Sequence, residues 1–186
     1  MGQKTTKRLF RFWTIADFEA EEEFLREQHK QGWKFVKYTL PGFYTFEAST
    51  PEDVIYQLDF TDTKCKATPA YLQMFADYGW EYLLTVNGFN YFRKPAVAHA
   101  PEDLTIFSDP QSKIDMIQKI TCRRLLPILV ILLCCIIPQL SIQSQYDDLA
   151  SRILYGVFII LFIVYIVLIM HISVTLAKLR KKYQKD

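Results

Sequence analysis

The sequence is short of the residue types on which most catalytic and metal sites depend. Its 186 residues include three histidines and four cysteines, and no two cysteines have the C-x-x-C spacing of a zinc or redox site. A phosphate-binding glycine loop, an HExxH motif and a GxSxG motif are also absent from the sequence. We therefore predict that the protein is not an enzyme and holds no metal or cofactor.

A strong charge of one sign is missing as well. The formal net charge is +2, and no long basic stripe occurs in the first half of the chain, which argues against a nucleic-acid partner. The first 16 residues also lack the apolar core of a secretory signal, so we expect the N-terminus to stay inside the cell.

Long apolar runs are present, and they lie in the last third of the chain. Residues 125–142 carry no charge and are about long enough for a transmembrane helix, which needs about 17 to 25 residues. Residues 153–176 form a second, longer uncharged run. Residues 143–152 connect the two runs and contain two aspartates. We predict two transmembrane helices joined by this external loop.

Basic residues at the ends of these runs predict the orientation. The loop has only Arg152, whereas the segments at 111–124, expected as a basic juxtamembrane helix, and at 177–186, expected as a basic tail, carry several lysines and arginines. Such residues favour the cytoplasmic side, so we predict a multi-pass protein of the plasma membrane with both termini in the cytoplasm. The residues expected to contact the membrane surface are Lys119, Arg123, Arg124, Lys178, Arg180, Lys181 and Lys182.

The first half of the chain contains two stretches that resemble each other. Gly32-Trp33 is answered by Gly79-Trp80, and Tyr44 by Tyr91, each about 47 residues later. Each stretch has the pattern of strand, helix, strand, strand. We predict an α+β cytoplasmic domain over residues 1–94 made of a duplicated, ferredoxin-like βαββ unit, with a mainly antiparallel sheet on one side and both helices on the other, followed by a linker at 95–110.

Aromatic residues are too numerous in the predicted strands to lie all beneath the helices. Because alternate strand residues face opposite sides, some should line an open sheet face that binds a partner protein or a small apolar ligand. The alternative is that they only pack the sheet. The residues we select for this face are Trp33, Tyr44, Tyr56, Trp80 and Tyr91.

One carboxylate pair invites comparison with catalytic sites. Asp59 and Asp62 follow a predicted strand, and paired carboxylates can divide acid and base roles. The simpler interpretation is a turn stabilised by side-chain to backbone hydrogen bonds. A pocket that collects Asp59, Asp62 and a tyrosine would favour an enzyme instead.

Three motifs resemble an uncharacterised domain family of Gram-positive bacteria, mostly Firmicutes. They are YQLDF at residues 56–60, YLQMFADYGWEYL at 71–83 and NYFRK at 90–94, and the resemblance covers roughly residues 7 to 95. Members of that family commonly carry C-terminal membrane helices, and their genes often lie near PadR-type transcriptional repressors. The resemblance implies no activity and transfers no site residue.

Together these observations predict a membrane-anchored, non-enzymatic interaction or sensory module. Its expected partners are the lipid bilayer and a regulatory or membrane protein, with a second copy of the chain as a further option. An accessory subunit of a transporter or envelope complex is the alternative, and an unrecognised enzyme is the second alternative.

Overall fold

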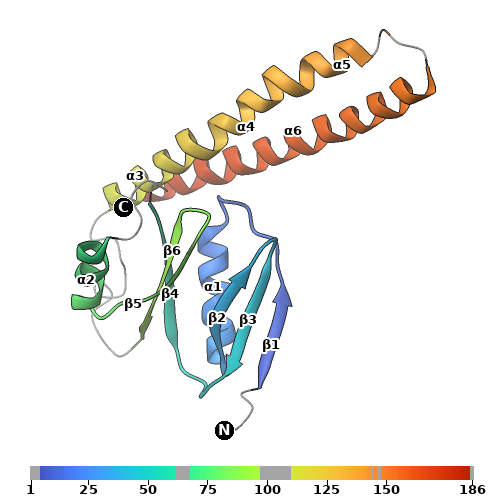
Figure 1. The fold of residues 1–186 in the computed structure, drawn as a ribbon. Helices are drawn as coiled ribbons and strands as arrows, with labels where there is room; N and C mark the ends of the chain where they lie inside the picture. Colours follow the sequence, from blue (N-terminus) through green and yellow to red (C-terminus); the bar gives the residue numbers. More distant parts are fainter. Residues whose placement is uncertain (1–4, 62–67, 97–109, 144, 146–147, 185–186) are drawn as a thin grey trace. The chain divides into compact units, whose positions relative to one another are not determined.

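Two successive βαββ segments make up the part of the chain before residue 96 in the computed structural model (Figure 1). The structure describes residues 5–61, 68–96, 110–143, 145 and 148–184. The first segment consists of β1 (Thr6–Phe10), α1 (Phe18–Lys30), β2 (Trp33–Thr39) and β3 (Phe43–Ala48). The second consists of β4 (Val54–Phe60), α2 (Pro69–Asp77), β5 (Glu81–Val86) and β6 (Phe89–Pro95).

Each segment forms its own three-stranded antiparallel sheet. The strand orders are β1-β3-β2 and β4-β6-β5, so the third strand of each segment lies in the middle. Both sheets have an irregularity in the second strand, between Phe35 and Lys37 and between Tyr82 and Leu84. The α+β class is therefore confirmed, whereas the expected single sheet with both helices on one side is replaced by two sheets.

Local sequence signals explain where the elements begin and end. Gly32 and Gly79 have φ of +83° and +79°, the left-handed conformation that ends a helix and that glycine adopts without strain. Asn87 and Gly88 also have positive φ, as the two-residue turn between β5 and β6 requires. Thr68 accepts a hydrogen bond from the Tyr71 amide, and Pro69 occupies the first turn of α2.

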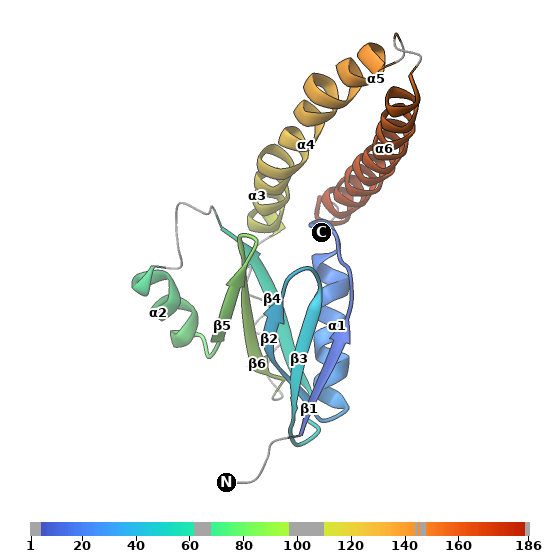
Figure 2. The same cartoon turned by 45° about the vertical axis from the view of Figure 1, so that its right-hand side comes forward.

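Helix α1 belongs to the core of both segments. It packs against β2 of its own segment and, more extensively, against the edge strand β4 of the next segment (Figures 1 and 2). Its inward stripe consists of Phe18, Glu21, Leu25, Gln28 and His29. Helix α2 packs against β5, where Phe75, Trp80 and Phe92 form a second apolar cluster. On the edge strand β4, the backbone amide of Leu58 donates a hydrogen bond of 2.7 Å to Glu22 of α1, so the helix satisfies a backbone group of this strand.

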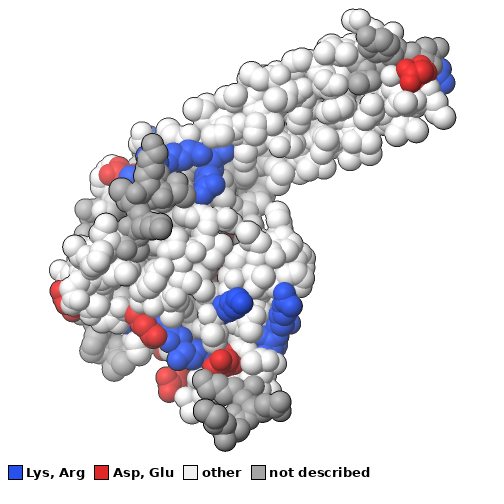
Figure 3. Space-filling model, viewed as in Figure 1, with Lys and Arg blue, Asp and Glu red and all other residues white. Residues whose placement is uncertain are grey.

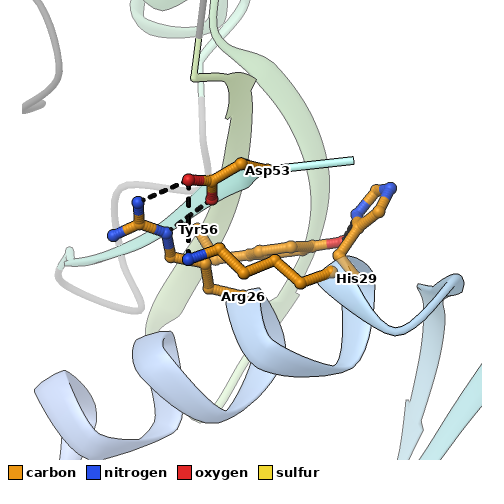
Figure 4. Close-up of polar contacts among 5 residues, drawn as sticks. Arg26, His29, Asp53 and Tyr56 are labelled. Atoms are coloured by element: carbon orange, nitrogen blue, oxygen red, sulfur yellow. Dashed lines mark hydrogen bonds and ion pairs between the residues drawn. The ribbon is translucent and has the colours of Figure 1, made fainter. Parts of the chain in front are cut away.

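Polar contacts attach the end of α1 to the second segment (Figure 4). Arg26 forms a bidentate ion pair with Asp53, with nitrogen to oxygen distances of 2.7 and 2.8 Å, and Lys30 lies 3.5 Å from the same carboxylate. One turn further, the His29 Nδ1 atom lies 2.7 Å from the buried Tyr56 hydroxyl. The ion pair is exposed and contributes about 0.2–1 kcal/mol, so it orients the helix more than it stabilises the fold.

The C-terminal part consists of two long helices. The first is continuous from α3 (Pro110–Ile120) through η2 (Thr121–Leu125), α4 (Leu126–Ile131) and η3 (Leu132–Ile136) to α5 (Ile137–Gln143). The second is α6 (Leu149–Tyr183), which runs beside the first as a hairpin (Figure 2). It contains the predicted span 153–176 and continues through basic residues that were expected in a tail.

Two prolines explain the π-helical turns η2 and η3. Leu126, just before Pro127, donates its amide to the carbonyl of Thr121, and Ile137, just before Pro138, donates to Leu132, each five residues back. Proline has no amide hydrogen and crowds the carbonyl four residues earlier, so the preceding turn widens. The two sites are 11 residues apart, or about three helical turns, and therefore lie on one side of the helix.

Both long helices are apolar enough to cross a membrane. The candidate spans are Gln111–Ile142 and Leu149–Tyr183, and 11% and 0% of their most apolar windows are buried. A core helix of a soluble protein would be mostly buried instead. The visible face of the hairpin has no charged residue along its middle (Figure 3). The basic residues expected at the membrane surface all lie on these helices, in η2, at the end of α3 and at the end of α6.

Candidate functional site

The aromatic residues selected from the sequence are mostly inside the protein. Tyr44, Tyr56, Trp80 and Tyr91 are between 2% and 4% exposed, and Trp33 is half-buried beneath the Lys7 ammonium group. These five residues therefore do not form an open sheet face. The outward side of the first sheet is largely polar instead, and its members include Arg8, Phe10, Lys34, Lys37, Phe43, Thr45 and Glu47.

Two of the selected tyrosines meet at one carboxyl group. The hydroxyls of Tyr44, on β3, and Tyr91, on β6, each donate a hydrogen bond of 2.6 Å to Oε1 of Glu21, on α1. Burial raises the pKa of both phenols, so both hydroxyls keep their protons and remain donors. Three elements from two segments thus converge on a glutamate that is 7% exposed.

The strand register explains how both tyrosines reach the same side. Three residues separate Thr39 from its partner Phe43 in the first hairpin, whereas two separate Val86 from its partner Phe89 in the second. The second hairpin loop is therefore one residue shorter than the first, which shifts the register of β6 by one position. The residue of β6 that occupies the position of Tyr44 in β3 is Asn90 and not Tyr91. Because a shift of one residue reverses the face of every side chain, Asn90 faces α2 and Tyr91 faces α1.

A small cavity of about 50 Å³ lies beside Glu21. This volume exceeds the space that one water molecule needs, about 10–15 Å³. Five of its ten lining residues are aromatic, and one carries a carboxyl group. We call it the Glu21 pocket; its lining residues are Trp13, Thr14, Ile15, Glu21, Tyr38, Tyr44, Val86, Asn87, Phe89 and Tyr91.

Burial makes Glu21 an unusual carboxyl group. Loss of water raises its pKa, the hydrogen bonds from Tyr44 and Tyr91 oppose that rise, and the nearby Asp17 carboxylate adds to it. The indole nitrogen of Trp13 is also buried, and it has no hydrogen-bond partner among the described residues. The pocket therefore contains a carboxyl group whose pKa is raised, and one of its wall residues, Trp13, carries a buried indole donor without a partner among the described residues.

The next residue, Glu22, has a structural role at the same place. Its Oε1 accepts a hydrogen bond of 2.7 Å from the backbone amide of Leu58, on the edge strand β4. Burial raises the pKa of Glu22 to about 8, while the Leu58 amide and the Lys113 ammonium group act in the opposite direction. The folded protein therefore holds a proton on Glu22 at pH values where the unfolded chain has released it.

This difference predicts that stability decreases as the pH rises. Between the unfolded pKa of about 4.5 and the folded pKa of about 8, each such proton contributes a slope of up to about 1.4 kcal/mol per pH unit. We expect Glu22→Gln, which keeps the acceptor for Leu58, to flatten this slope and to leave stability below pH 4.5 nearly unchanged. Urea titrations of the full chain in detergent at pH 4 to 9, followed by tryptophan emission, measure the unfolding free energy at each pH and hence the slope. The exposed Glu23→Gln is the control, and equal slopes in wild type and Glu22→Gln would contradict the assignment.

A second pocket lies near the other end of α1. It has a volume of about 330 Å³, and its lining includes His29, Lys34, Glu52, Glu81 and Arg93. Arg93 is 7% exposed and forms two hydrogen bonds of 2.6 Å with the Glu81 carboxylate. Since these charges neutralise each other, this pocket offers a ligand less unbalanced charge than the Glu21 pocket does.

The carboxylate pair considered for catalysis is only partly described. Asp59 accepts a hydrogen bond of 2.5 Å from the Tyr71 hydroxyl, and Asn90 contacts that hydroxyl and Thr61. Asp62 lies outside the described residues, as do Cys65, His99 and most of the linker predicted at 95–110. Asp59 thus belongs to a polar network between α2 and β6.

Glu21 was not among the residues predicted as a site, although its spacing in α1 carries a signal. Residues 18, 21, 25 and 28 follow the three- and four-residue spacing of a buried helical stripe, and Glu21 is the acidic member. An acidic residue at such a position is rarely buried unless it is hydrogen-bonded or functional.

Comparison with known proteins is consistent with a domain that carries no assigned activity. Residues 17–131 match the family described as protein of unknown function (DUF2812). The match begins at α1, includes the whole second βαββ segment and ends in α4. No curated protein and no solved structure gives a significant match. Since the matched residues make up more than half of the chain, the protein belongs to the DUF2812 family of proteins of unknown function.

Proposed function

We propose that the protein is a membrane-anchored, non-enzymatic sensory module that responds to a small ligand in the Glu21 pocket and passes its state to a partner protein. The observation that carries the proposal is a pocket of about 50 Å³ that contains a buried carboxyl group, in a chain that continues into two apolar helices. Binding pockets often combine apolar walls with a few such polar groups.

The two helices supply the anchor in this proposal. They cross the plasma membrane with both ends of the chain in the cytoplasm, because the basic residues of η2 and of the last turns of α6 flank their apolar middles. The two βαββ segments before residue 96, which we call the soluble part, form a duplicated, ferredoxin-like unit in this proposal. The shared strand order and the equivalent irregularities at Phe35/Lys37 and Tyr82/Leu84 support this duplication.

An exposed apolar patch beside the pocket is the proposed contact with the partner. Phe10, Phe12 and Leu40 are 56%, 66% and 63% exposed. The backbone amide of Arg11 donates a 2.9 Å hydrogen bond to the carbonyl oxygen of Gly42, which brings the chain at residues 10–12 close to the chain at residues 40–42. We call Phe10, Phe12 and Leu40 the Phe12 patch. Trp13, the next residue, lines the Glu21 pocket, so the pocket and the patch share one short backbone segment.

The regulatory side of the proposal also fits the family that the sequence motifs resemble. A family of Firmicutes membrane proteins encoded near PadR-type repressors suits a module that controls a regulator by interaction. An accessory subunit of a transporter would bind its partner constitutively instead, independently of the pocket.

A photocrosslinking experiment distinguishes these alternatives. A benzoyl-phenylalanine replaces Phe12 in the full chain, and Tyr78, which is 71% exposed on the other segment, receives the same residue as a matched control. After irradiation in cells and an alkaline wash of the membranes, we expect the chain in the membrane fraction with one protein adduct at position 12 and none at position 78. We further expect Glu21→Gln to change the adduct yield at least about threefold, because it removes the carboxyl group of the pocket and with it the preference for the bound state.

The other outcomes overturn the proposal. If the alkaline wash removes the chain from the membranes, the two apolar helices do not anchor it. Equal adducts at positions 12 and 78 would exclude the Phe12 patch as the contact. An adduct whose yield does not respond to Glu21→Gln would favour the constitutive subunit.

A further inference from the structure

We infer that the Glu21 pocket binds a small organic ammonium group, carried by an amino alcohol or its methylated form. The inference rests on the proposed function, in which this pocket receives the signal. It specifies the chemistry that the pocket recognises.

The carboxyl group of Glu21 is placed to receive a cation. Both hydrogen bonds that the described residues make to it end on Oε1, where Tyr44 and Tyr91 donate. A carboxylate has about four acceptor positions, so the second oxygen retains its capacity for a ligand. The two phenols hold the side chain in one orientation, which reduces the ordering that a ligand would require.

The charges around the pocket also favour a cation. None of the described residues that line it is a lysine or an arginine. The titratable groups that interact with Glu21 include Asp17 and Glu22 on the same helix, Tyr38 on β2, Tyr44 on β3 and Tyr91 on β6, and none of these is basic. A buried carboxylate without a positive partner is costly, and a bound ammonium group would supply that partner.

The walls of the pocket select the kind of cation. Five aromatic rings line it, and the negative face of an aromatic ring attracts a weakly hydrated cation. An alkaline-earth ion is usually held by several carboxylate or carbonyl oxygens, whereas Glu21 is the single carboxyl group among the described residues that line this pocket. The rings are those of Trp13, Tyr38, Tyr44, Phe89 and Tyr91.

The Trp13 indole adds a second point of recognition. Its buried N–H has no acceptor among the described residues. A ligand with a hydroxyl oxygen a few atoms from its ammonium group would pair with this donor while the ammonium group contacts Glu21. The volume of about 50 Å³ is well below the roughly 300–1,000 Å³ of pockets that enclose a whole ligand, so only a small head group enters it.

Choline is the probe for the test. The full chain is placed in nanodiscs of phosphatidylglycerol, which contain no ammonium groups, and Trp emission is followed during titration with choline chloride. The uncharged isostere 3,3-dimethylbutan-1-ol and sodium chloride are the reference titrants. We expect saturable binding of choline, at least about tenfold weaker binding of the isostere, and no response to sodium chloride.

Two substitutions locate the binding. Glu21→Gln keeps an acceptor for both phenols but removes the charge, and we expect it to weaken choline binding at least about tenfold. Glu23→Gln makes the same change at an exposed position of α1 and should leave binding unchanged. Circular dichroism checks that both variants fold, and the comparison of choline with its isostere on the wild-type chain remains decisive if Glu21→Gln does not fold.

The source of the ammonium group is tested in the same system. If a lipid head group occupies the pocket, nanodiscs that contain phosphatidylethanolamine will weaken choline binding by competition; if the natural ligand is a free amino alcohol, choline will bind equally in both. Equal binding of choline and its isostere, or equal binding to wild type and Glu21→Gln, would overturn the inference. A pocket-dependent crosslink at position 12 would then leave the sensory function standing with a different ligand.

Discussion

We expect Phe46→Ala to lower the free energy of unfolding of the soluble part by about 3–5 kcal/mol. Phe46 lies in the central strand of the first sheet and is fully buried, with 0% exposure. Its ring centroid is 6.1 Å from that of Phe24, on α1, and 5.9 Å from that of Phe35, on β2. Truncation removes the ring that α1 and two strands share, and the neighbouring strands prevent the cavity from closing.

The chain offers both a reporter and a matched control for this experiment. All three tryptophans, Trp13, Trp33 and Trp80, precede the apolar helices, so their emission during a urea titration in detergent reports the soluble part. Phe12→Ala removes the same atoms at a position that is 66% exposed, and we expect a loss below about 0.5 kcal/mol. Similar losses for both variants would show that burial at Phe46 does not stabilise the fold.

Features set by a few neighbouring residues could be predicted from the sequence. These features are the start of α2 at Pro69, the ends of both helices at Gly32 and Gly79, and the turn at Asn87-Gly88. Each depends on a backbone conformation that only certain residues adopt without strain. The two helices long and apolar enough to cross a membrane were predictable for a similar reason, because composition alone reveals them.

The side of a sheet that a residue faces could not be predicted in the same way. The sequence offset of 47 pairs Tyr44 with Tyr91, but the second hairpin loop is one residue shorter than the first. One residue reverses the face of a strand, so the tyrosine that resembled Tyr44 reaches α1 from the opposite side of its own sheet. The open aromatic face that we expected from the sequence does not form, because the second sheet has α2 on one side and α1 on the other.

The pocket itself depends on contacts between distant parts of the chain. Tyr91 is 70 residues from Glu21, and the two meet only because α1 packs beside β4 of the next segment. Periodicity places Glu21 on the buried stripe of α1, but it does not reveal which donors lie opposite. The functional proposal therefore depends on tertiary packing, whereas the anchor depends on composition.

A final prediction compares the two glycines that end α1 and α2. Both have positive φ, which costs an alanine about 1–2 kcal/mol, so we expect Gly79→Ala to destabilise the soluble part by that amount. A Cβ atom at Gly79 would meet only the end of the flexible Lys94 side chain, at 3.6 Å. At Gly32 it would lie 3.0 Å from the backbone oxygen of Ser49 and 3.4 Å from Pro51. We therefore expect Gly32→Ala to cost more, about 2–4 kcal/mol in total.

The physical reason for the difference is the connection between the two segments. Gly32 accepts a hydrogen bond of 2.9 Å from the Ser49 amide, so the backbone that would have to move is part of the link from β3 to β4. Gly156→Ala is the control, because a Cβ atom there would meet nothing within 4 Å and the site lies in α6. Urea titrations of the three variants, followed by tryptophan emission, measure the order. Equal losses of unfolding free energy for Gly32→Ala and Gly79→Ala would contradict this prediction. They would mean that the positive φ alone sets the cost and that the close approach of Gly32 to Ser49 adds nothing.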